Sequence, residues 1–352
     1  MNKRKVVTLQ DIAQALGISS AAVSKALNGH QGIGEQTKRK VEEMAASLGY
    51  DKRRKISRQT SSMDGETTLH VLLVAEHQNL NDPFFASIYL SIDREMKAHG
   101  YELNLFTIQS SADYMMRFKL PVIKPHVFVL FGRIPEAIAT SFIHSGVPSI
   151  AIDHEFQLAP NIDSIGVNDY AGAFHAVRHL YENGHRRIGF IGDNDLSPSF
   201  SQRAHGFHDA MRRYGLAVDE SYIINLNLRT ADGNIRLDPI QQSLHVARLP
   251  TAYFCANDPI AFYVSQCLTA LGIDIPSQVS IIGFDNLEAT QWSNPPLTTI
   301  HFPREQIGTV LREILQRRLA NPQNITMRIL INPHIVVRQS VHKKDTLENP
   351  GI

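Results

Sequence analysis

The sequence predicts a small all-α module followed by a larger α/β core of two doubly wound parallel-sheet lobes. Near the N-terminus, apolar residues recur at helical spacing, and from residue 69 onward short apolar strands alternate with amphipathic helices. Repeated β-α-β units imply parallel sheets with helices on both faces. The chain has 352 residues, and the α/β pattern covers about 270 of them, more than one core comfortably holds.

The N-terminal module reads as a helix-turn-helix over residues 8–28. Two short amphipathic helices meet at Gly17, and the hydroxyls of Thr8 and Ser19 are expected to cap them. The expected apolar faces are Ile12, Ala15 and Leu16 in the first helix and Val23, Ala26 and Leu27 in the second. Ser20, Ala21, Ser24 and Lys25 then point outward, as required of a helix that enters the DNA major groove. The pattern therefore predicts binding to a specific DNA sequence.

The rest of the N-terminal region is predicted to contain a third helix followed by a basic linker. A third helix is expected over residues 35–48, with Val41, Met44, Ala45 and Leu48 inward, so that residues 1–50 form the head and residues 51–67 a basic hinge or linker. Residues 1–60 carry 12 Lys and Arg against 5 Asp and Glu, although the whole chain has a formal net charge of only +1. A basic module on a mildly acidic core suits a polyanion at one end of the chain.

The core, residues 68–340, shows the alternation that defines its fold class. We expect strands at residues 70–75, 101–106, 127–131, 149–152, 187–191, 222–226, 251–256, 279–283, 327–331 and 335–337. Helices are expected at residues 85–99, 135–145, 170–183, 203–214, 259–271 and 304–319. The last 12 residues, 341–352, are a tail without a leucine heptad, so no tetramer built in that way is expected.

Polar residues follow several of these strands. Ligands of open parallel sheets bind outside the carboxyl ends of the strands. Asp153, Asp193, Asn257, Asp258 and Asp285 stand at such ends, and Phe84 and Phe85 could form an apolar wall. Carboxylate and amide acceptors suit a polyhydroxylated ligand such as a sugar. Plainer interpretations stay open: Asp258 before Pro259 fits an N-cap, Asp193 a turn, Phe84 and Phe85 a core, and Arg203 a surface position.

Several function classes find no support in the sequence. Walker, G-x-G-x-x-G, G-x-S-x-G and H-E-x-x-H motifs are missing, so we expect no enzyme and no cofactor. His205 and His208 form the one helical histidine pair of note, without further ligands nearby, so no metal is expected. Cys255 and Cys267 read as buried thiols of a reducing compartment. Without a signal-peptide pattern or a membrane-length apolar run, a soluble cytoplasmic protein without membrane contacts is expected.

Over essentially its whole length the chain resembles the LacI/GalR family of bacterial transcription regulators. The head is similar to that family's T-L-x-D-I-A-x-x-x-G-[VI]-S-x-x-[TA]-V-S-[RK]-x-L-N signature. Further matches are Asn81-Asp-Pro-Phe-Phe85, Gly184-His-Arg-Arg-Ile-Gly-Phe-Ile-Gly192, Cys255-Ala-Asn-Asp258, Val279-Ser-Ile-Ile-Gly-Phe-Asp285, Pro295-Pro-Leu-Thr-Thr299 and Val336-Val-Arg338.

The resemblance implies a periplasmic-binding-protein-like core whose two lobes are joined by three chain crossings. Lobe 1 would comprise about residues 69–167 and 298–329, and lobe 2 about residues 168–297 and 330–340. Two cores would form a homodimer, so that two heads address a pseudo-palindromic operator. Positions that contact a small-molecule effector in the family correspond here to Phe84, Phe85, Asp153, Arg203, Asn257 and Asp285.

The resemblance also implies how the head would contact DNA. Base edges would be read by Ser20, Ala21 and Lys25, with Ala21 and Ala22 beside thymine methyl groups and Lys25 reaching guanine. The remaining DNA-binding candidates are Thr8, Ser19, Ser24, Asn28 and Thr37. The hinge departs from the family pattern, since Lys52 replaces a proline and Gln59 the expected leucine. Arg53 and Arg54 are therefore expected on phosphates, and Ile56 is the remaining candidate for insertion into the minor groove.

These observations predict a repressor whose operator affinity is controlled allosterically by a sugar-like ligand between two lobes. One alternative is a regulator that responds to a nucleoside or nucleobase, or to a protein partner. An alternative of another class is a sugar-binding protein without a gene-regulatory role.

Overall fold

The structure of the chain is a computed structural model that describes residues 9–19, 22–23, 26, 34–47, 68–108, 125–153, 162–193, 197–225, 238–244 and 248–344. The chain divides into two compact units, Met1–Thr67 and Thr68–Ile352.

The N-terminal unit is helical around a small apolar core. Helices α1 (Leu9–Leu16) and α3 (Glu35–Ser47) pack on each other. Their buried side chains, with two from the segment between them, are Ile12, Ala13, Val23, Ala26, Val41 and Ala45. The prediction was wrong for Ala15, which is exposed while Ala13 is buried. Successive residues turn by about 100°, so Ile12, Ala13 and Leu16 share one stripe and Ala15 falls outside it.

The turn after α1 has the predicted features. Gly17 has a φ of +66°, in the left-handed region that glycine adopts without a steric cost. The Ser19 hydroxyl accepts a hydrogen bond from the Ala22 backbone N–H at 3.2 Å, which confirms Ser19 as a cap.

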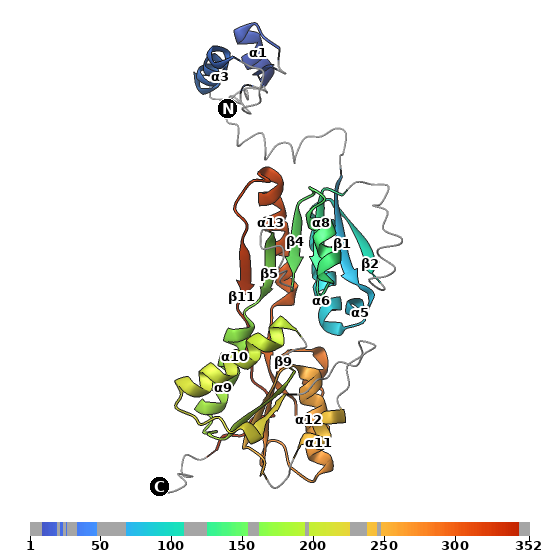
Figure 1. Cartoon of the computed structure of the whole chain (residues 1–352), viewed down its shortest axis with the longest axis vertical. Helices are drawn as coiled ribbons and strands as arrows, with labels where there is room; N and C mark the ends of the chain where they lie inside the picture. The colour runs from blue at the N-terminus through green and yellow to red at the C-terminus, as the bar shows by residue number, and fades with distance from the viewer. Residues whose placement is uncertain are drawn as a thin grey trace, which may run out of the picture. The chain divides into compact units, whose positions relative to one another are not determined.

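The first sheet of the core has six parallel strands in the order β11-β5-β4-β3-β1-β2 (Figure 1). Its strands are β1 (Leu69–Glu76), β2 (Tyr101–Ile108), β3 (Val127–Phe131), β4 (Ser149–Ile152), β5 (Asp163–Val167) and β11 (Arg328–Ile331). The helices of this lobe are α5 (His77–Leu80), α6 (Pro83–Ala98), α8 (Glu136–Ile143) and α13 (Ile307–Ala320), the last preceded by the 3-10 turn η4 (Arg304–Gln306). Every residue of β3 is buried, as expected of a strand covered on both faces.

The second sheet has six strands in the order β12-β10-β9-β8-β6-β7, parallel except for the antiparallel pair β10–β12. Its strands are β6 (Ile188–Gly192), β7 (Ile223–Asn225), β8 (Ala252–Cys255), β9 (Ser280–Asp285), β10 (Thr298–His301) and β12 (His334–Val336). Its helices are α9 (Asp169–Glu182), α10 (Pro198–Arg213), α11 (Asp238–Ser243) and α12 (Asp258–Ala270), with 3-10 turns η1 (Glu220–Tyr222) and η3 (Glu288–Gln291).

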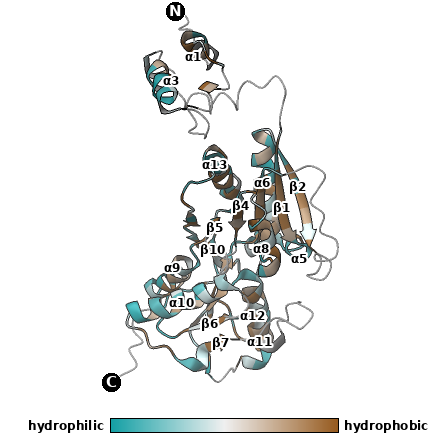
Figure 2. Ribbon diagram, turned by 45° about the horizontal axis from the view of Figure 1, so that its top comes forward, coloured by the Kyte–Doolittle hydropathy of each residue, from teal (hydrophilic) through white to brown (hydrophobic). Residues whose placement is uncertain are grey.

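Strands such as β1 and β2 are hydrophobic, whereas parts of α10 are hydrophilic (Figure 2).

The chain crosses between the lobes between β5 and α9, between β10 and η4, and between β11 and β12. Asn168, in the first crossing, donates its side-chain amide to the Asn332 side-chain oxygen at 2.9 Å and its backbone N–H to the Ile331 carbonyl at 3.0 Å. These bonds tie the first and third crossings together.

Two predicted boundaries differ from the observed ones. Residues 298–301 were assigned to lobe 1, but they form β10 and pair with β9 in the second sheet. Residues 330 and 331 were assigned to lobe 2, but they complete β11 on β5 in the first. The apolar side chains of Leu297 and Ile300 are buried, which holds β10 in lobe 2 and moves the crossing to residues 302–303.

The predicted strands and helices of the core are present with small shifts, and four elements were not predicted. Strands β5 and β10 and the short helices α5 and α11 had no predicted counterpart. Helix α10 begins at Pro198 instead of Arg203, because Ser197 caps it and accepts from the Phe200 backbone N–H at 3.4 Å. Arg203 therefore lies in the second turn of this helix.

Candidate functional site: a charged cavity between two lobes

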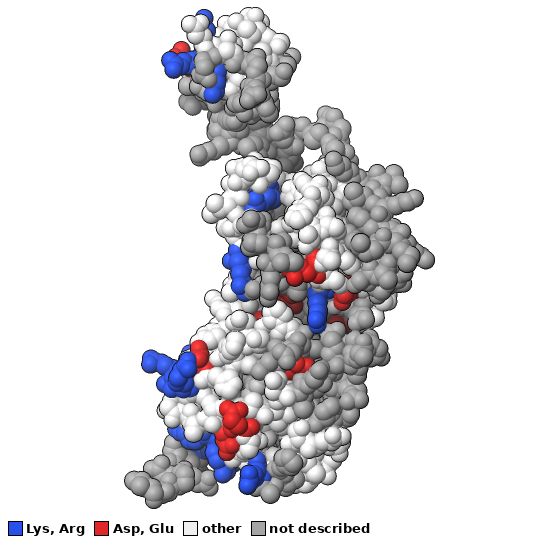
Figure 3. Space-filling view, viewed as in Figure 1, with Lys and Arg blue, Asp and Glu red and all other residues white. Residues whose placement is uncertain are grey.

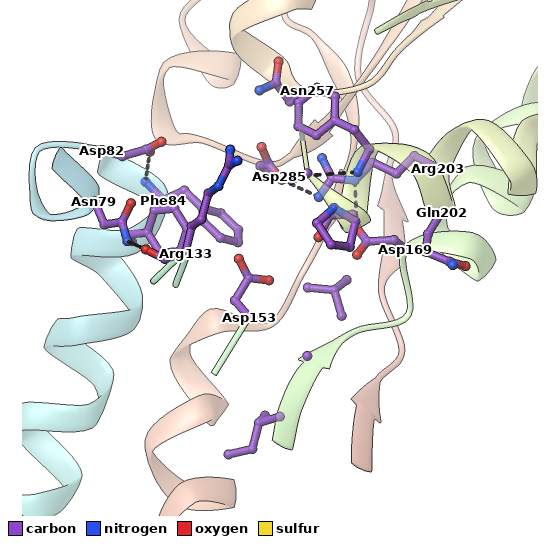
Figure 4. Close-up of a pocket in the computed structure, with 18 of the residues that line it drawn as sticks. Asn79, Asp82, Phe84, Arg133, Asp153, Asp169, Gln202, Arg203, Asn257 and Asp285 are labelled. Atoms are coloured by element: carbon purple, nitrogen blue, oxygen red, sulfur yellow. Dashed lines mark hydrogen bonds and ion pairs between the residues drawn. The ribbon is translucent and has the colours of Figure 1, made fainter. Parts of the chain in front are cut away.

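A cavity of about 720 Å³ lies between the two lobes of the core, and both lobes line it. Lobe 1 contributes Phe84, Phe85, Arg133 and Asp153, and lobe 2 contributes Asp169, Arg203, Asn257 and Asp285. Figure 4 labels all of these residues except Phe85 and shows their side chains around the cavity. Figure 3 shows acidic and basic side chains together where the lobes meet.

Arg203 is the centre of the lobe 2 side. Its Nε donates to Asp169 Oδ1 at 2.7 Å, and its Nη1 donates to the Ala256 carbonyl at 2.6 Å. Its Nη2 lies 3.4 Å from Asp285 Oδ1. The guanidinium also lies 3.7 Å from the centre of the Phe284 ring, a favourable cation–π position. Arg203 is thus buried with two carboxylates and held in one orientation.

Asp153 and Asp285 lie at the carboxyl ends of strands, and both have a positive φ, which residues with a side chain rarely adopt. Asp153 follows β4 with a φ of 55°, and Asp285 ends β9 with a φ of 106°. The Asp153 backbone N–H donates to the Ile165 carbonyl at 2.8 Å. Residues in such conformations persist where the surrounding structure imposes them and are frequent at ligand sites.

Burial dominates the titration of the cavity carboxylates. Burial, reinforced by the charge of Asp169, raises the pKa of Asp153 to about 8. Burial also raises the pKa of Asp285 to about 7, although Arg203 and Arg304 oppose that rise. The pKa of Asp169 is raised by burial and lowered in part by Arg203. The cavity therefore holds carboxylates whose charge is costly without a partner.

An aromatic wall closes the lobe 1 side. Asp82 caps α6 by accepting from the Phe84 backbone N–H at 2.8 Å, and Pro83 begins the helix. The rings of Phe84 and Phe85 meet edge-to-face with centres 5.2 Å apart, and Phe85 meets Phe131 in the same way at 5.5 Å. The wall is thus anchored in the lobe 1 core and offers apolar surface to the cavity.

Asn257 caps α12, and Asp258 does not. The Asn257 side-chain oxygen accepts from the Ile260 backbone N–H at 3.0 Å. Asp258, interpreted above as the cap, is the first residue of the helix and is fully buried. Its carboxylate accepts from the Thr299 hydroxyl at 2.6 Å and from the Leu287 backbone N–H at 2.8 Å. Asp258 therefore fastens β10 and the turn that follows β9 to the start of α12, and Asn257 lines the cavity.

The structure brings all six predicted effector positions to this one cavity, and it also adds residues that were not predicted. Phe84, Phe85, Asp153, Arg203, Asn257 and Asp285 all line it. Asp169, Arg133, Tyr170, Gln202 and Arg328 line it too. Asp169 could have been found as a helix-starting acid after a strand, had β5 been predicted. Asp193, another strand-end acid, is buried outside the cavity lining.

The predicted DNA-binding residues are described only in part. Ser19 is exposed, and Ala22 and Thr37 are half-buried. Thr8, Ser20, Ala21, Ser24, Lys25, Asn28, Arg53, Arg54 and Ile56 lie outside the described residues. For the DNA-binding prediction, the structure shows the helices of the head, the turn at Gly17 and the cap at Ser19.

The histidines, cysteines and helices of the described residues bear on the metal and membrane predictions. His205 is exposed and His208 half-buried, and no group of three His, Cys, Asp or Glu side chains among the described residues is arranged to hold a metal ion. Both cysteines are buried and unbonded. Within the same residues, every helix is too short or too polar to cross a bilayer.

A helical head and a two-lobed core with a ligand-sized cavity define a DNA-binding regulator with a periplasmic-binding-protein-like core. Residues 8–52 match the family described as bacterial regulatory proteins, lacI family, and residues 177–341 match the periplasmic binding protein-like domain. The chain is 30% identical over 304 residues to the HTH-type transcriptional repressor CytR of Escherichia coli (strain K12), covering 86% of each protein. The chain belongs to the LacI/GalR family of bacterial transcription regulators and is a DNA-binding repressor.

Two further similarities extend over nearly the whole chain. The HTH-type transcriptional repressor PurR of Actinobacillus pleuropneumoniae serotype 3 (strain JL03) is 28% identical over 341 residues, covering 96% of this chain and 98% of the relative. A solved complex of the transcriptional regulator CelR with cellobiose has the same fold, with a TM-score of 0.67, 22% identity and coverage of 95% of this chain and 99% of that one.

Proposed function

We propose that the chain acts as a homodimer on a pseudo-palindromic operator and that a small ligand in the interlobe cavity controls its affinity for DNA. The observation that supports this most is the composition of the cavity wall. Asp153 comes from lobe 1, and Arg203 and Asp285 come from lobe 2. A ligand that contacts both lobes favours one lobe arrangement over another, which is what an allosteric effector must do.

The chemistry of the wall favours a sugar or sugar derivative. Carboxylate and amide oxygens of Asp153, Asp285 and Asn257 can accept from several hydroxyl groups, while Phe84 and Phe85 offer a face to a ring. The regulator CelR, which has the same fold, has been solved with cellobiose. A carbohydrate-responsive repressor is therefore the function that the cavity supports best.

A nucleoside is the second candidate, and the aromatic wall is the observation that favours it. The edge-to-face pair Phe84 and Phe85 could hold a flat base, while the acceptors across the cavity bind the ribose hydroxyls. A signal from a protein partner instead of a ligand would leave the cavity without a role.

The ligand experiment is a melting-temperature screen of the full-length protein against sugars, sugar phosphates and nucleosides. Asp285→Ala should abolish the shift and the effect of the ligand on operator binding, while operator binding itself persists. A normal response of this variant would contradict the cavity as effector site. A screen in which no small molecule shifts the wild type would favour a protein partner.

The DNA experiment uses Lys25→Ala, because Lys25 is the residue expected to reach guanine. We expect operator affinity to fall by about 1–3 kcal/mol, or about 5–150-fold, with ligand affinity unchanged. Wild-type affinity should also fall steeply with salt, because the segment from Lys52 to Lys55 is basic. An unchanged footprint and affinity in Lys25→Ala would contradict the assignment of the recognition helix.

A further inference from the structure

Asp153 differs from the other carboxylates of the cavity in having no partner of its own. Its side chain faces the cavity (Figure 4). Among the described residues, no hydrogen bond or ion pair reaches its carboxylate, although its backbone N–H is bonded to Ile165. Asp153 follows a strand, so it also lacks the helix N-terminus that supports an acid at the first position of a helix.

The carboxylates across the cavity already have a cationic neighbour, Arg203. Asp169 is bonded to Arg203 and is the first residue of α9. Asp285 lies beside Arg203 Nη2. The guanidinium of Arg203 is therefore shared by two carboxylates before any ligand arrives, and Arg304 also acts on Asp285.

Most of the charges that act on Asp153 have the wrong sign to stabilise its anion. The carboxylates of Asp169, Asp285 and Asp82 raise its pKa, and the guanidinium of Arg203 lowers it only in part. Over the whole cavity wall, five carboxylates stand against three guanidinium groups, from Glu76, Asp82, Asp153, Asp169 and Asp285 and from Arg133, Arg203 and Arg328. Because burial and these neighbours disfavour the anion of Asp153, a cationic ligand group would stabilise that anion, whereas a further negative charge would not.

A metal ion is not the cation that suits this cavity. The described residues contain no group of three His, Cys, Asp or Glu side chains arranged around a metal position. The cavity, at about 720 Å³, is also far larger than an ion and has an aromatic wall. An organic cation matches both the size and the chemistry of the space.

We propose that the effector is a polyhydroxylated amine, whose protonated nitrogen donates to Asp153 while its hydroxyl groups bind Asp285 and Asn257. This inference rests on the proposed function, because it concerns the same interlobe cavity. The nitrogen forms a charge-assisted hydrogen bond with Asp153, and the ring of the ligand lies against Phe84 and Phe85. The carboxylates of the wall disfavour a phosphorylated ligand relative to the amine.

The experiment compares matched ligands by calorimetry on the full-length protein. Glucosamine, galactosamine and mannosamine are each measured beside the parent hexose, the N-acetylated form and the amine 6-phosphate. N-acetylation keeps the nitrogen but removes its charge. We expect at least one amine to bind tenfold or more tighter than its parent and its N-acetylated form, and the phosphate to bind more weakly than the amine.

Two variants locate the effect. Asp153→Asn should reduce the ratio of amine to parent affinity to about one. Asp82→Asn removes a carboxylate from the same cavity but keeps an N-cap for α6, because asparagine caps as well as aspartate. This control should keep most of the preference for the amine.

The outcomes distinguish the inference from the function on which it rests. Parent sugars that bind as tightly as their amines would overturn the inference and leave a sugar-responsive repressor intact. A preference that survives Asp153→Asn would overturn the role of Asp153. If neither these ligands nor a wider panel of neutral sugars and nucleosides bound, the proposed function would fail together with the inference.

Discussion

The two lobes share a sheet architecture but bring opposite chemistry to the cavity. Lobe 2 presents charges that are paired with each other, since Arg203 bonds Asp169 and lies beside Asp285. Lobe 1 presents an aromatic pair and Asp153, whose carboxylate has no partner among the described residues. The comparison teaches that lobe 2 is organised before a ligand binds, while lobe 1 carries the group that a ligand must satisfy.

The strongest way to break this comparison is to remove the charge that organises lobe 2. Arg203→Ala leaves Asp169 and Asp285 buried without their partner. Breaking a buried ion pair from one side typically costs about 3–5 kcal/mol. We therefore expect a loss of that size in the free energy of unfolding at pH 7, measured with denaturant, and loss of the effector response.

Arg212→Ala is the matched control on the same helix. Arg212 also pairs with an aspartate, Asp209, but its side chain is 78% exposed, and exposed pairs contribute about 0–1 kcal/mol. Equal losses in the two variants would mean that the Arg203 cluster does not organise lobe 2.

Sequence patterns predicted the elements and the polar strand ends well, because both depend on local spacing. Asp153 and Asp285 were found as acids that follow apolar strands, a signal contained in a few residues. Strand β5 was missed because Asp163-Ser-Ile-Gly-Val167 contains only two large apolar side chains, and its pairing with β4 and β11 supplies the rest. Without β5, the position of Asp169 at a strand end could not be recognised.

The partners of the buried charged residues depend on tertiary contacts and could not be predicted from spacing within one segment. Asp169 and Arg203 are 34 positions apart and meet because α9 and α10 pack side by side. Asp258 looked like a cap beside Pro259, yet its carboxylate reaches Thr299, 41 positions away. Such pairs depend on how helices lie on a sheet, which periodicity in one segment does not contain.

A second way to test the comparison uses pH. Because the native state holds the pKa of Asp153 at about 8, it keeps a proton that the unfolded chain releases above about pH 4. The contribution of Asp153 to the free energy of unfolding therefore falls as pH rises from about 4 to about 8. Asp153→Asn removes this penalty, so the variant should match the parent at pH 4 and exceed it at pH 8 by about 1 kcal/mol or more.

Unfolding curves of the parent and of Asp153→Asn from pH 4 to pH 8 would measure this difference. Parallel curves for Asp153→Asn and the parent would show that the folded protein does not raise the pKa of Asp153. The contrast between the lobes would then be lost.

The smallest effect concerns Asn257, which serves lobe 2 as a helix cap and also faces the cavity. Asn257→Ala should cost about 1 kcal/mol in the free energy of unfolding, because α12 loses its cap, and Asn257→Ser should restore most of it. If the amide also binds the effector, calorimetry will show weak ligand binding in both variants. Affinity that recovers together with stability in Asn257→Ser would reduce Asn257 to a structural residue, and ligand recognition on the lobe 2 side would then depend on Arg203 and Asp285.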